Sequence, residues 1–256
     1  MPRPTAGSGK ISVLIPAYNE ELFIEKVLTQ VRHCFEVIQF SNFEIVVCDN
    51  LSTDKTAALA TGAGAIVVSE PHQQIARARN SAAKAATGEW FIFLDADTLV
   101  SPELIKATVQ AFQSGKICGG GSALIFDRSN LGLFTRGITG CWNWVSKTFR
   151  LAAGSYIFCS QSAWSDIGGF DETLYASEEI DFSRAVKRWG KTRGLKFEVF
   201  TKHPVVTSAR KLDWYSEWQL LGHILRLLHP KAKRRKESCD LWYTRPSNST
   251  TNHKAP

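Results

Sequence analysis

The sequence predicts an α/β fold with three layers, in which helices cover both faces of a mostly parallel central sheet. The first observation is an uninterrupted apolar run at residues 90–94, typical of a strand that is buried on both faces. The second is the alternation of apolar runs with helix-length segments through the first half of the chain. Two further runs, at residues 11–15 and 44–48, supply neighbouring strands.

The remaining elements follow from periodicity and from residues that cap helices. Apolar residues at helical spacing predict helices over residues 20–31, 54–60, 75–86, 101–112, 131–151 and 178–189. Asp54 and Ser177 stand where they can cap two of these helices, and Pro102 occupies a tolerated first-turn position. Residues 65–68 predict a short buried strand, and residues 122–126 predict another.

Length and composition indicate one globular domain with a tail. The chain has 256 residues, of which 44% are hydrophobic and 21% are charged. No run approaches the ~18 apolar residues that cross a bilayer, and residues 1–10 lack the apolar core of a secretory signal. The six cysteines are scattered, which predicts reduced thiols. We therefore expect a cytoplasmic protein with a disordered lead-in at residues 1–10 and a domain at residues 11–210.

The C-terminal part of the chain has a different pattern. Residues 212–228 place aromatic and aliphatic side chains on one helical face, and the basic run at residues 231–236 follows directly. This composition is typical of a helix at the inner face of a membrane, so residues 212–236 are a candidate peripheral membrane contact. The alternative is a helix docked on the domain. We expect residues 211–245 to form this unit, residues 246–256 to be disordered, and nucleic acid not to be a partner.

Two carboxylates follow directly on the apolar run at residues 90–94. Asp95 and Asp97 share one side of an extended chain, so both can face one hard cation. A divalent metal held by one or two carboxylates completes its ligand shell with substrate phosphates. The pattern therefore predicts a site for a nucleotide diphosphate at the carboxyl end of a central strand. The alternative is a solvated turn that caps the next helix.

An ordered set of motifs resembles the family 2 glycosyltransferases. The set spans about residues 10 to 210 and contains residues 15–20 (Ile-Pro-Ala-Tyr-Asn-Glu), Asp49 with residues 52–54, residues 77–80 (Arg-Ala-Arg-Asn), residues 94–98 (Leu-Asp-Ala-Asp-Thr), residues 167–172 (Ile-Gly-Gly-Phe-Asp-Glu) and residues 178–181 (Glu-Glu-Ile-Asp). The resemblance implies a single domain of the GT-A type and an inverting transfer of a sugar from a nucleotide donor. The acceptor remains open between a soluble glycan and a lipid-linked sugar or polyprenyl phosphate.

The resemblance also assigns donor-binding residues. Asp49 would accept a hydrogen bond from the N3–H of uracil and Tyr18 would stack on the ring, which favours a UDP-sugar. Pro16, Ala17 and Glu20 would line the same pocket. An N-cap or loop acid is the alternative for Asp49.

The diphosphate would be neutralised by Mg²⁺ or Mn²⁺ at Asp95 and Asp97, with Arg79 and Arg210 as further candidates to contact the donor. Many relatives add a late histidine as a metal ligand, but residues 207–208 here are Thr-Ser. His203 is the displaced candidate for that role. Otherwise the ligands would be Asp97, the diphosphate and water.

Glu179 is the predicted general base, since it holds the place of the second acid in the family's Glu-Asp pair. Glu178 and Asp181 are alternatives, because the longer side chain of Glu179 leaves open which acid reaches the acceptor. Acids at a helix start also stabilise the helix dipole without any catalytic role.

Two other functional classes remain open. A nucleotidyltransferase also places acids and a metal on such a sheet, but its glycine- and arginine-rich loop is absent after the first strand. A degenerate transferase that acts as a peripheral membrane scaffold would not need Asp95, Asp97 and Glu179, which are all present.

Overall fold

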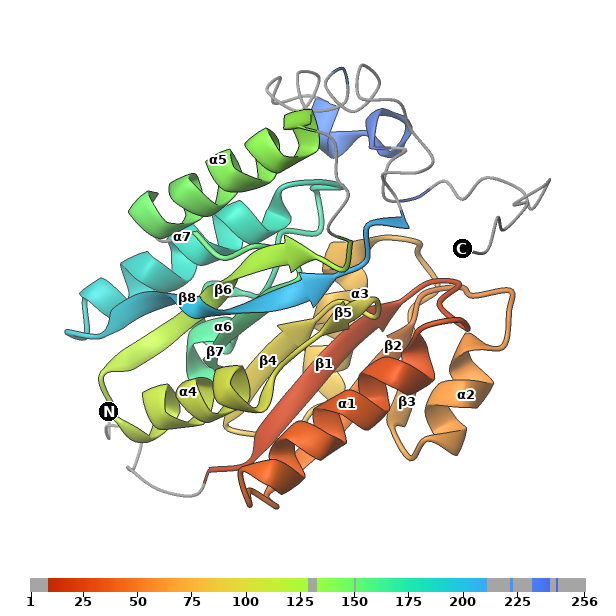
Figure 1. The fold of residues 1–256 in the computed structure, drawn as a ribbon, viewed down its shortest axis with the longest axis horizontal. Helices are drawn as coiled ribbons and strands as arrows, with labels where there is room; N and C mark the ends of the chain where they lie inside the picture. The colour runs from red at the N-terminus through yellow and green to blue at the C-terminus, as the bar shows by residue number, and fades with distance from the viewer. Residues whose placement is uncertain are drawn as a thin grey trace.

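The computed structural model of the chain describes residues 9–128, 133–149, 151–210, 222, 232–239 and 243. Its centre is an eight-stranded sheet with the strand order β3-β2-β1-β4-β7-β6-β8-β5 (Figure 1). The strands are β1 (Ile11–Ala17), β2 (Phe43–Asp49), β3 (Ile66–Ser69), β4 (Trp90–Leu94), β5 (Thr98–Leu99), β6 (Ile117–Phe126), β7 (Tyr156–Ser160) and β8 (Lys196–Thr207).

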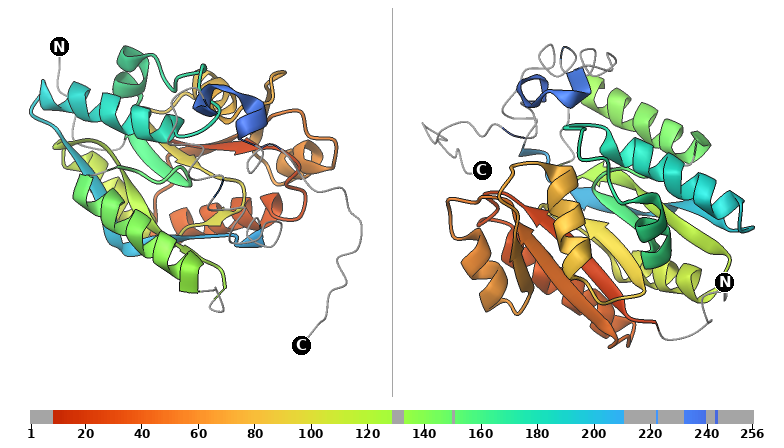
Figure 2. Two further views of the ribbon diagram at one scale, coloured as in Figure 1. Left: turned by 90° about the horizontal axis from the view of Figure 1, so that it is seen from above. Right: turned by 180° about the vertical axis from the view of Figure 1, so that it is seen from behind.

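Helices cover both faces of this sheet. They are α1 (Ile24–Val37), α2 (Thr56–Gly62), α3 (Ile75–Ala85), α4 (Pro102–Gln113), α5 (Leu133–Phe149), α6 (Gln161–Ile167) and α7 (Glu178–Lys191). The front and rear views place α1 and α4 on one face and α3, α6 and α7 on the other (Figures 1 and 2). The predicted three-layer α/β architecture is therefore confirmed.

The pairing differs between the two sides of the sheet. β3, β2, β1 and β4 run parallel to one another. β7 pairs antiparallel with both β4 and β6, β6 pairs parallel with β8, and the short β5 pairs antiparallel with β8. The sheet is mostly parallel as predicted, whereas the antiparallel insertion of β7 was not predicted, because its apolar residues carry no signal of direction.

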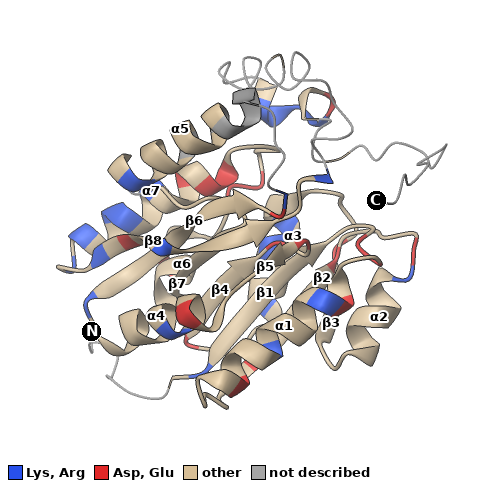
Figure 3. Cartoon of the chain, viewed as in Figure 1, with Lys and Arg blue, Asp and Glu red and all other residues tan. Residues whose placement is uncertain are grey.

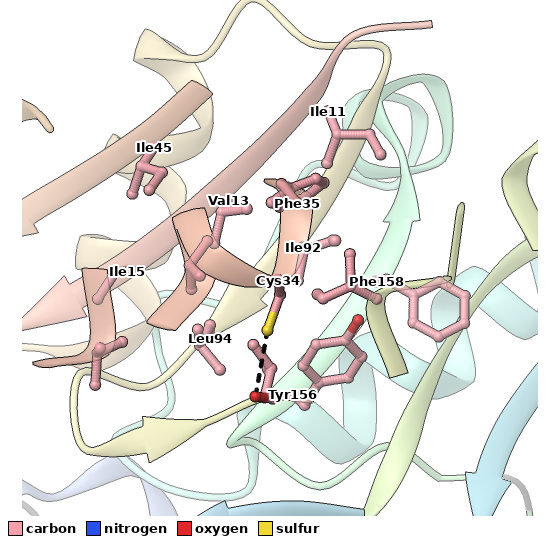
Figure 4. Packing of buried hydrophobic residues seen from close by; sticks show 14 of the residues in the cluster. Ile11, Val13, Ile15, Cys34, Phe35, Ile45, Ile92, Leu94, Tyr156 and Phe158 are labelled. Atoms are coloured by element: carbon pink, nitrogen blue, oxygen red, sulfur yellow. Dashed lines mark hydrogen bonds between the residues drawn. The ribbon is translucent and has the colours of Figure 1, made fainter. Parts of the chain in front are cut away.

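Most of the core lies in two clusters on opposite faces of the same strands, because successive strand residues point to opposite sides. Ile92 and Leu94 of β4 pack with α1 and α4. Phe91 and Phe93 pack on the other face with α3, α6 and α7. Figure 4 shows the first cluster, where alternate residues of β1 meet Cys34 and Phe35 of α1. Burial on both faces explains why residues 90–94 are apolar without a break.

Some local predictions differ from the structure in detail. β3 is an exposed edge strand and not a buried one, because only β2 pairs with it, and Ile66 is 48% exposed. Asp54 does accept a hydrogen bond from the backbone N–H of Thr56 at the start of α2. Ser177 precedes α7, but it has a left-handed backbone (φ 63°) and its side chain makes no capping bond.

The predicted helix over residues 212–228 lies outside the described residues, apart from Gly222. Part of the basic run is described and forms a 3₁₀ turn at Ala232–Arg234, followed by a second one at Lys236–Ser238. Among the described helices, none is long and apolar enough to cross a bilayer.

Candidate active site

The candidate site lies where β1, β2 and β4 end. The register pairs Ala17 at the end of β1 with Asp49 at the end of β2, and β4 ends at Leu94, one residue before Asp95. Since these strands are parallel, their carboxyl ends meet at one edge of the sheet, where α/β folds bind ligands. The fold thus gathers at one edge the predicted residues 16–20, Asp49, Asp95 and Asp97.

Arg79 connects this edge to the start of α7. Its side chain is 3% exposed, and it donates to Glu178 Oε1 at 2.7 Å, to Asp95 Oδ1 at 3.1 Å and to the carbonyl oxygen of Gly154 at 2.9 Å. A buried guanidinium requires such partners, because removing its charge from water is costly. Arg79 therefore joins α3, the end of β4 and α7 into one acidic cluster.

The three candidate acids of α7 differ in their surroundings. Glu178 is buried in the ion pair with Arg79, whereas Asp181 is exposed and pairs with Arg184 of its own helix at 3.3 Å. The structure thus places Asp181, the alternative for the base, outside the cluster. The reason is helical geometry, since Asp181 is rotated away from the sheet. Figure 3 shows these acids at the start of α7 and basic residues farther along.

Glu179 faces the cluster and has an altered acidity. A methyl group built on Gly154 would lie 3.3 Å from Nη2 of Arg79 and 3.7 Å from Cγ of Glu179, so both side chains flank that loop. Burial raises the pKa of Glu179 to about 8, the charges of Glu178 and Asp95 raise it too, and Arg79 opposes them. A carboxylate with a raised pKa is a stronger base than an ordinary one.

A second arginine lies on the other side of the carboxylate pair. Arg210 forms ion pairs with Glu20 and, at 3.2 Å, with Oδ2 of Asp97. Its guanidinium also stacks 4.3 Å above the ring of Phe23, a contact that sequence reasoning missed. The backbone N–H of Ser208 donates to the carbonyl oxygen of Asp97, which holds the two chain segments together.

The carboxylates at this edge suit a hard divalent cation. Asp95 and Asp97 offer the oxygen ligands that Mg²⁺ and Mn²⁺ prefer, and the Asp95 side chain is still 32% exposed. No group of three His, Cys, Asp or Glu side chains within the described residues is arranged to hold a metal. The remaining ligands would therefore come from donor phosphates and water.

His203 does not join this pair. β8 advances from Phe200 to Val205 while β6 advances only from Ser122 to Leu124, so residues 201–204 leave the ladder as a bulge. Bonds from the backbone and from Ser101, together with the charge of His203, lower the pKa of Glu103 at the start of α4. The structure thus places His203, the displaced candidate for a metal ligand, near Glu103, and no group of three possible ligands forms among the described residues.

One of the predicted donor-binding residues, Asp49, has a side-chain oxygen with unusual hydrogen bonding. Oδ1 of Asp49 is buried and has no hydrogen-bond partner. Buried polar atoms are normally bonded, so an isolated acceptor calls for an explanation. The next residue, Asn50, donates to the carbonyl oxygens of Glu70 and His72 and so fixes the chain that follows β3. Tyr18 and Pro16 are partly exposed at the same strand ends, and Ala17 is buried.

Two of the motifs pack against each other, which sequence reasoning did not anticipate. Asn80 donates to the carbonyl oxygen of Phe170 and accepts from its backbone N–H, both at 2.9 Å. Gly169 has a left-handed backbone, and a side chain there would lie 2.5 Å from Oδ1 of Asn80. The shared order of the motifs was the only signal for this contact, which holds the segment leading to α7 against α3.

The comparisons with known proteins define the class of protein. Residues 12–159, more than half of the chain, match the family model for glycosyl transferase family 2. The chain belongs to this family.

The solved structures agree on the fold. A mannosyltransferase of Pyrobaculum calidifontis, in complex with GDP-Man and Mn²⁺, superposes with a TM-score of 0.63 over 91% of this chain and 66% of that one, at 17% identity. Glucosyl-3-phosphoglycerate synthase of Mycobacterium tuberculosis, in complex with Mn²⁺ and UDP, superposes with a TM-score of 0.58. The match covers 94% of this chain and 82% of that one, at 20% identity. The fold is therefore of the GT-A type.

Curated relatives are similar over parts of their length. Dolichol-phosphate mannosyltransferase of Pyrococcus furiosus is 29% identical over 45% of this chain and 34% of its own. Chondroitin synthase of Pasteurella multocida is 23% identical over 79% of this chain and 22% of its own. The match thus covers about a third of the first relative and about a fifth of the second.

Proposed function

We propose that the chain is an inverting glycosyltransferase that moves a sugar from a nucleotide-diphosphate donor, a UDP-sugar, to an acceptor hydroxyl or lipid phosphate. The observation that carries this proposal is the position of Glu179, a carboxylate with a raised pKa beside Arg79 and Asp95 at the carboxyl end of β4. Family membership and the nucleotide donors bound by the structural neighbours support it.

Each candidate residue then has a role. Asp49 accepts from the donor base through its isolated Oδ1, and Tyr18, Pro16 and Ala17 form the wall beside it. Asp95 and Asp97 hold Mg²⁺ or Mn²⁺, which acts as a Lewis acid on the leaving diphosphate when bound.

Two arginines complete the donor site. Arg210, which pairs with Glu20 and Asp97, supplies positive charge for the diphosphate. Arg79 keeps the carboxylate of Asp95 in place, since it binds that group and α7 together.

Glu179 acts on the acceptor. Its carboxylate accepts the hydroxyl proton as the acceptor oxygen bonds to the anomeric carbon, while the bond from that carbon to the diphosphate oxygen breaks. One base and no dedicated nucleophile imply a single displacement, which inverts the anomeric configuration. Glu178 remains an ion-pair partner of Arg79 and keeps the pKa of Glu179 high by repulsion.

The test is a panel of UDP- and GDP-sugars with and without Mn²⁺, read by thermal shift and by release of the nucleoside diphosphate. A UDP-sugar at 100 times its Kd should add ~2.7 kcal/mol of stability. Stabilisation by GDP-sugars alone would move the donor assignment to guanine. A lack of response to every sugar nucleotide would favour the non-catalytic scaffold.

The acceptor proposal includes a lipid-linked substrate, reached through a peripheral membrane contact of residues 212–236. Exposed Trp144 and Phe149 on α5 support it, because they are 62% and 55% exposed. We expect co-sedimentation with anionic liposomes at low salt and release at high salt. Failure to sediment at low salt would favour a soluble glycan acceptor.

A further inference from the structure

The first turn of α7 has no side-chain hydrogen bond from its N-cap residue. Ser177 has a left-handed backbone and gives no side-chain cap, although α7 begins with the two acids of the candidate site. A non-glycine residue in this conformation is strained and persists only where its surroundings hold it. From one side, the amide of Gln74 donates to the carbonyl oxygens of Glu172 and Leu174, both at 2.8 Å.

The C-terminal segment, defined here as residues 232–239 together with Tyr243, holds the same loop from the other side. The backbone N–H of Tyr175 donates to the carbonyl oxygen of Lys233 at 2.7 Å. The hydroxyl of Tyr243 donates to the carbonyl oxygen of Tyr175 at 3.1 Å, and the two rings meet edge to face. Figure 2 shows the turns of this segment, in dark blue, at the end of the molecule where α3 and α7 begin.

The same hydroxyl also contacts α3. It accepts from the backbone N–H of Ile75, the first residue of α3, at 3.3 Å. Ile75 lies four residues before Arg79, which is about one helical turn. Tyr243 therefore joins the helix that carries Arg79 to the loop that leads into Glu178, its ion-pair partner.

Packing around Tyr243 keeps this hydroxyl in place. Tyr243 is 8% exposed, and Cys239 is fully buried beside it with Ala176. Lys236 donates to Oε1 of Gln73 at 2.7 Å. Burial raises the pKa of Tyr243 and the charge of Glu178 raises it further, so the phenol keeps the proton that it donates.

We propose that Tyr243 is a positioning residue for the candidate catalytic acids, since its hydroxyl holds the start of α7 at the distance from α3 at which Arg79 meets Glu178. The inference rests on the proposed function of Glu179 as the base. It extends the site to a residue far outside the region that matches the family model, which ends at residue 159.

The test is Tyr243→Phe in the full chain, which keeps the ring and removes both hydrogen bonds. We expect kcat to fall by on the order of 10-fold to 10²-fold, because a small displacement of a catalytic group is costly. The KM for the nucleotide sugar should stay within about twofold, because the two hydrogen bonds of the Tyr243 hydroxyl go to Ile75 and Tyr175, which are not among the proposed donor-binding residues. Equal changes in kcat and donor KM, or no change in kcat, would overturn the inference.

Tyr175→Phe is the matched control. It makes the same chemical change in the other ring of the pair, and the Tyr175 hydroxyl has no hydrogen bond to any of the described residues. This variant should keep the kcat of the original protein. Lys236→Met, which removes the bond to Gln73, should lower kcat in the same direction as Tyr243→Phe but by less.

Hydrogen exchange separates this inference from the proposed function. In Tyr243→Phe, the amide of Ile75 should lose protection, and so should the amide of Ile180, which bonds to Ser177 at the start of α7. If the original protein has no transferase activity, the proposed function fails, and this measurement alone decides the structural inference. Unchanged exchange at Ile180 would overturn it.

Discussion

The two sides of the sheet assemble their parts of the site in different ways. From β1 to β4 the chain alternates strand and helix, and each strand delivers its polar residues directly at its carboxyl end, as with Asp49 and Asp95. Beyond β4 the acids arrive on a helix, and Arg79 of α3 reaches across to hold Glu178. The donor side therefore depends on strand order, and the acid side depends on a long-range ion pair.

Loss of the metal carboxylate should give the largest effect. Asp97→Ala removes a predicted ligand and one ion-pair partner of Arg210, whose pair with Glu20 stays, so transfer should become undetectable while the fold survives. EDTA should abolish turnover of the original protein in the same way. Turnover and circular dichroism check both points, and Asp166→Ala, which removes a carboxylate that pairs with Arg193 and not with Arg210, is the control. Full activity in EDTA would remove the metal from the mechanism.

Glu179→Gln tests the acid side next. The change keeps size and removes the basic oxygen, so kcat should fall by at least ~10²-fold while donor binding persists. Asp181→Asn makes the same type of change on the exposed side of α7 and should have little effect. If Asp181→Asn alone lowers kcat, the assignment of the base to Glu179 is wrong.

The pH dependence of the reaction gives a companion measurement for Glu179. The base must lose its proton before it acts, and its pKa of about 8 lies well above the usual 4.5. The rate should therefore rise with pH through a limb displaced above pH 4.5, and Glu179→Gln should remove that limb. A rate that is already constant from pH 5 upward would contradict the raised pKa.

Arg79→Met breaks the connection between the two sides. It leaves Glu178 buried without its partner, so unfolding free energy should fall by about 3–5 kcal/mol. Adding Glu178→Met removes the unpaired charge and should restore part of that loss, as a double-mutant cycle in denaturant would measure. Strictly additive losses would mean that the pair does not couple the two sides.

Asp49→Asn should give the smallest effect, confined to the donor side. The amide can still donate and accept hydrogen bonds, but the change removes the negative charge opposite the donor base. The preference for UDP over GDP should therefore shrink by ~10-fold, which corresponds to about 1.4 kcal/mol of binding free energy. Thermal shift with each diphosphate measures it, with Asp166→Asn as the control. An unchanged preference would mean that Asp49 has only a structural role at the end of β2.

The sequence by itself determined the parts of the fold that depend on local pattern. Apolar runs, helical spacing and the order of the motifs predicted β1, β2, β4, most helices and the family. They also brought Asp49, Asp95 and Glu179 forward as candidates. Periodicity and burial are properties of neighbouring residues, so a single sequence records them directly.

Only the tertiary structure decided which candidates meet. Arg79 and Glu178 are 99 residues apart in the chain, and Ile75 and Tyr243 are 168 apart. The same folding turned Asp181 to solvent and placed His203 in a bulge beside α4. Such contacts depend on how whole elements pack. Burial of a charge is tolerated only where packing brings an opposite charge next to it, and no local pattern in the sequence records that pairing.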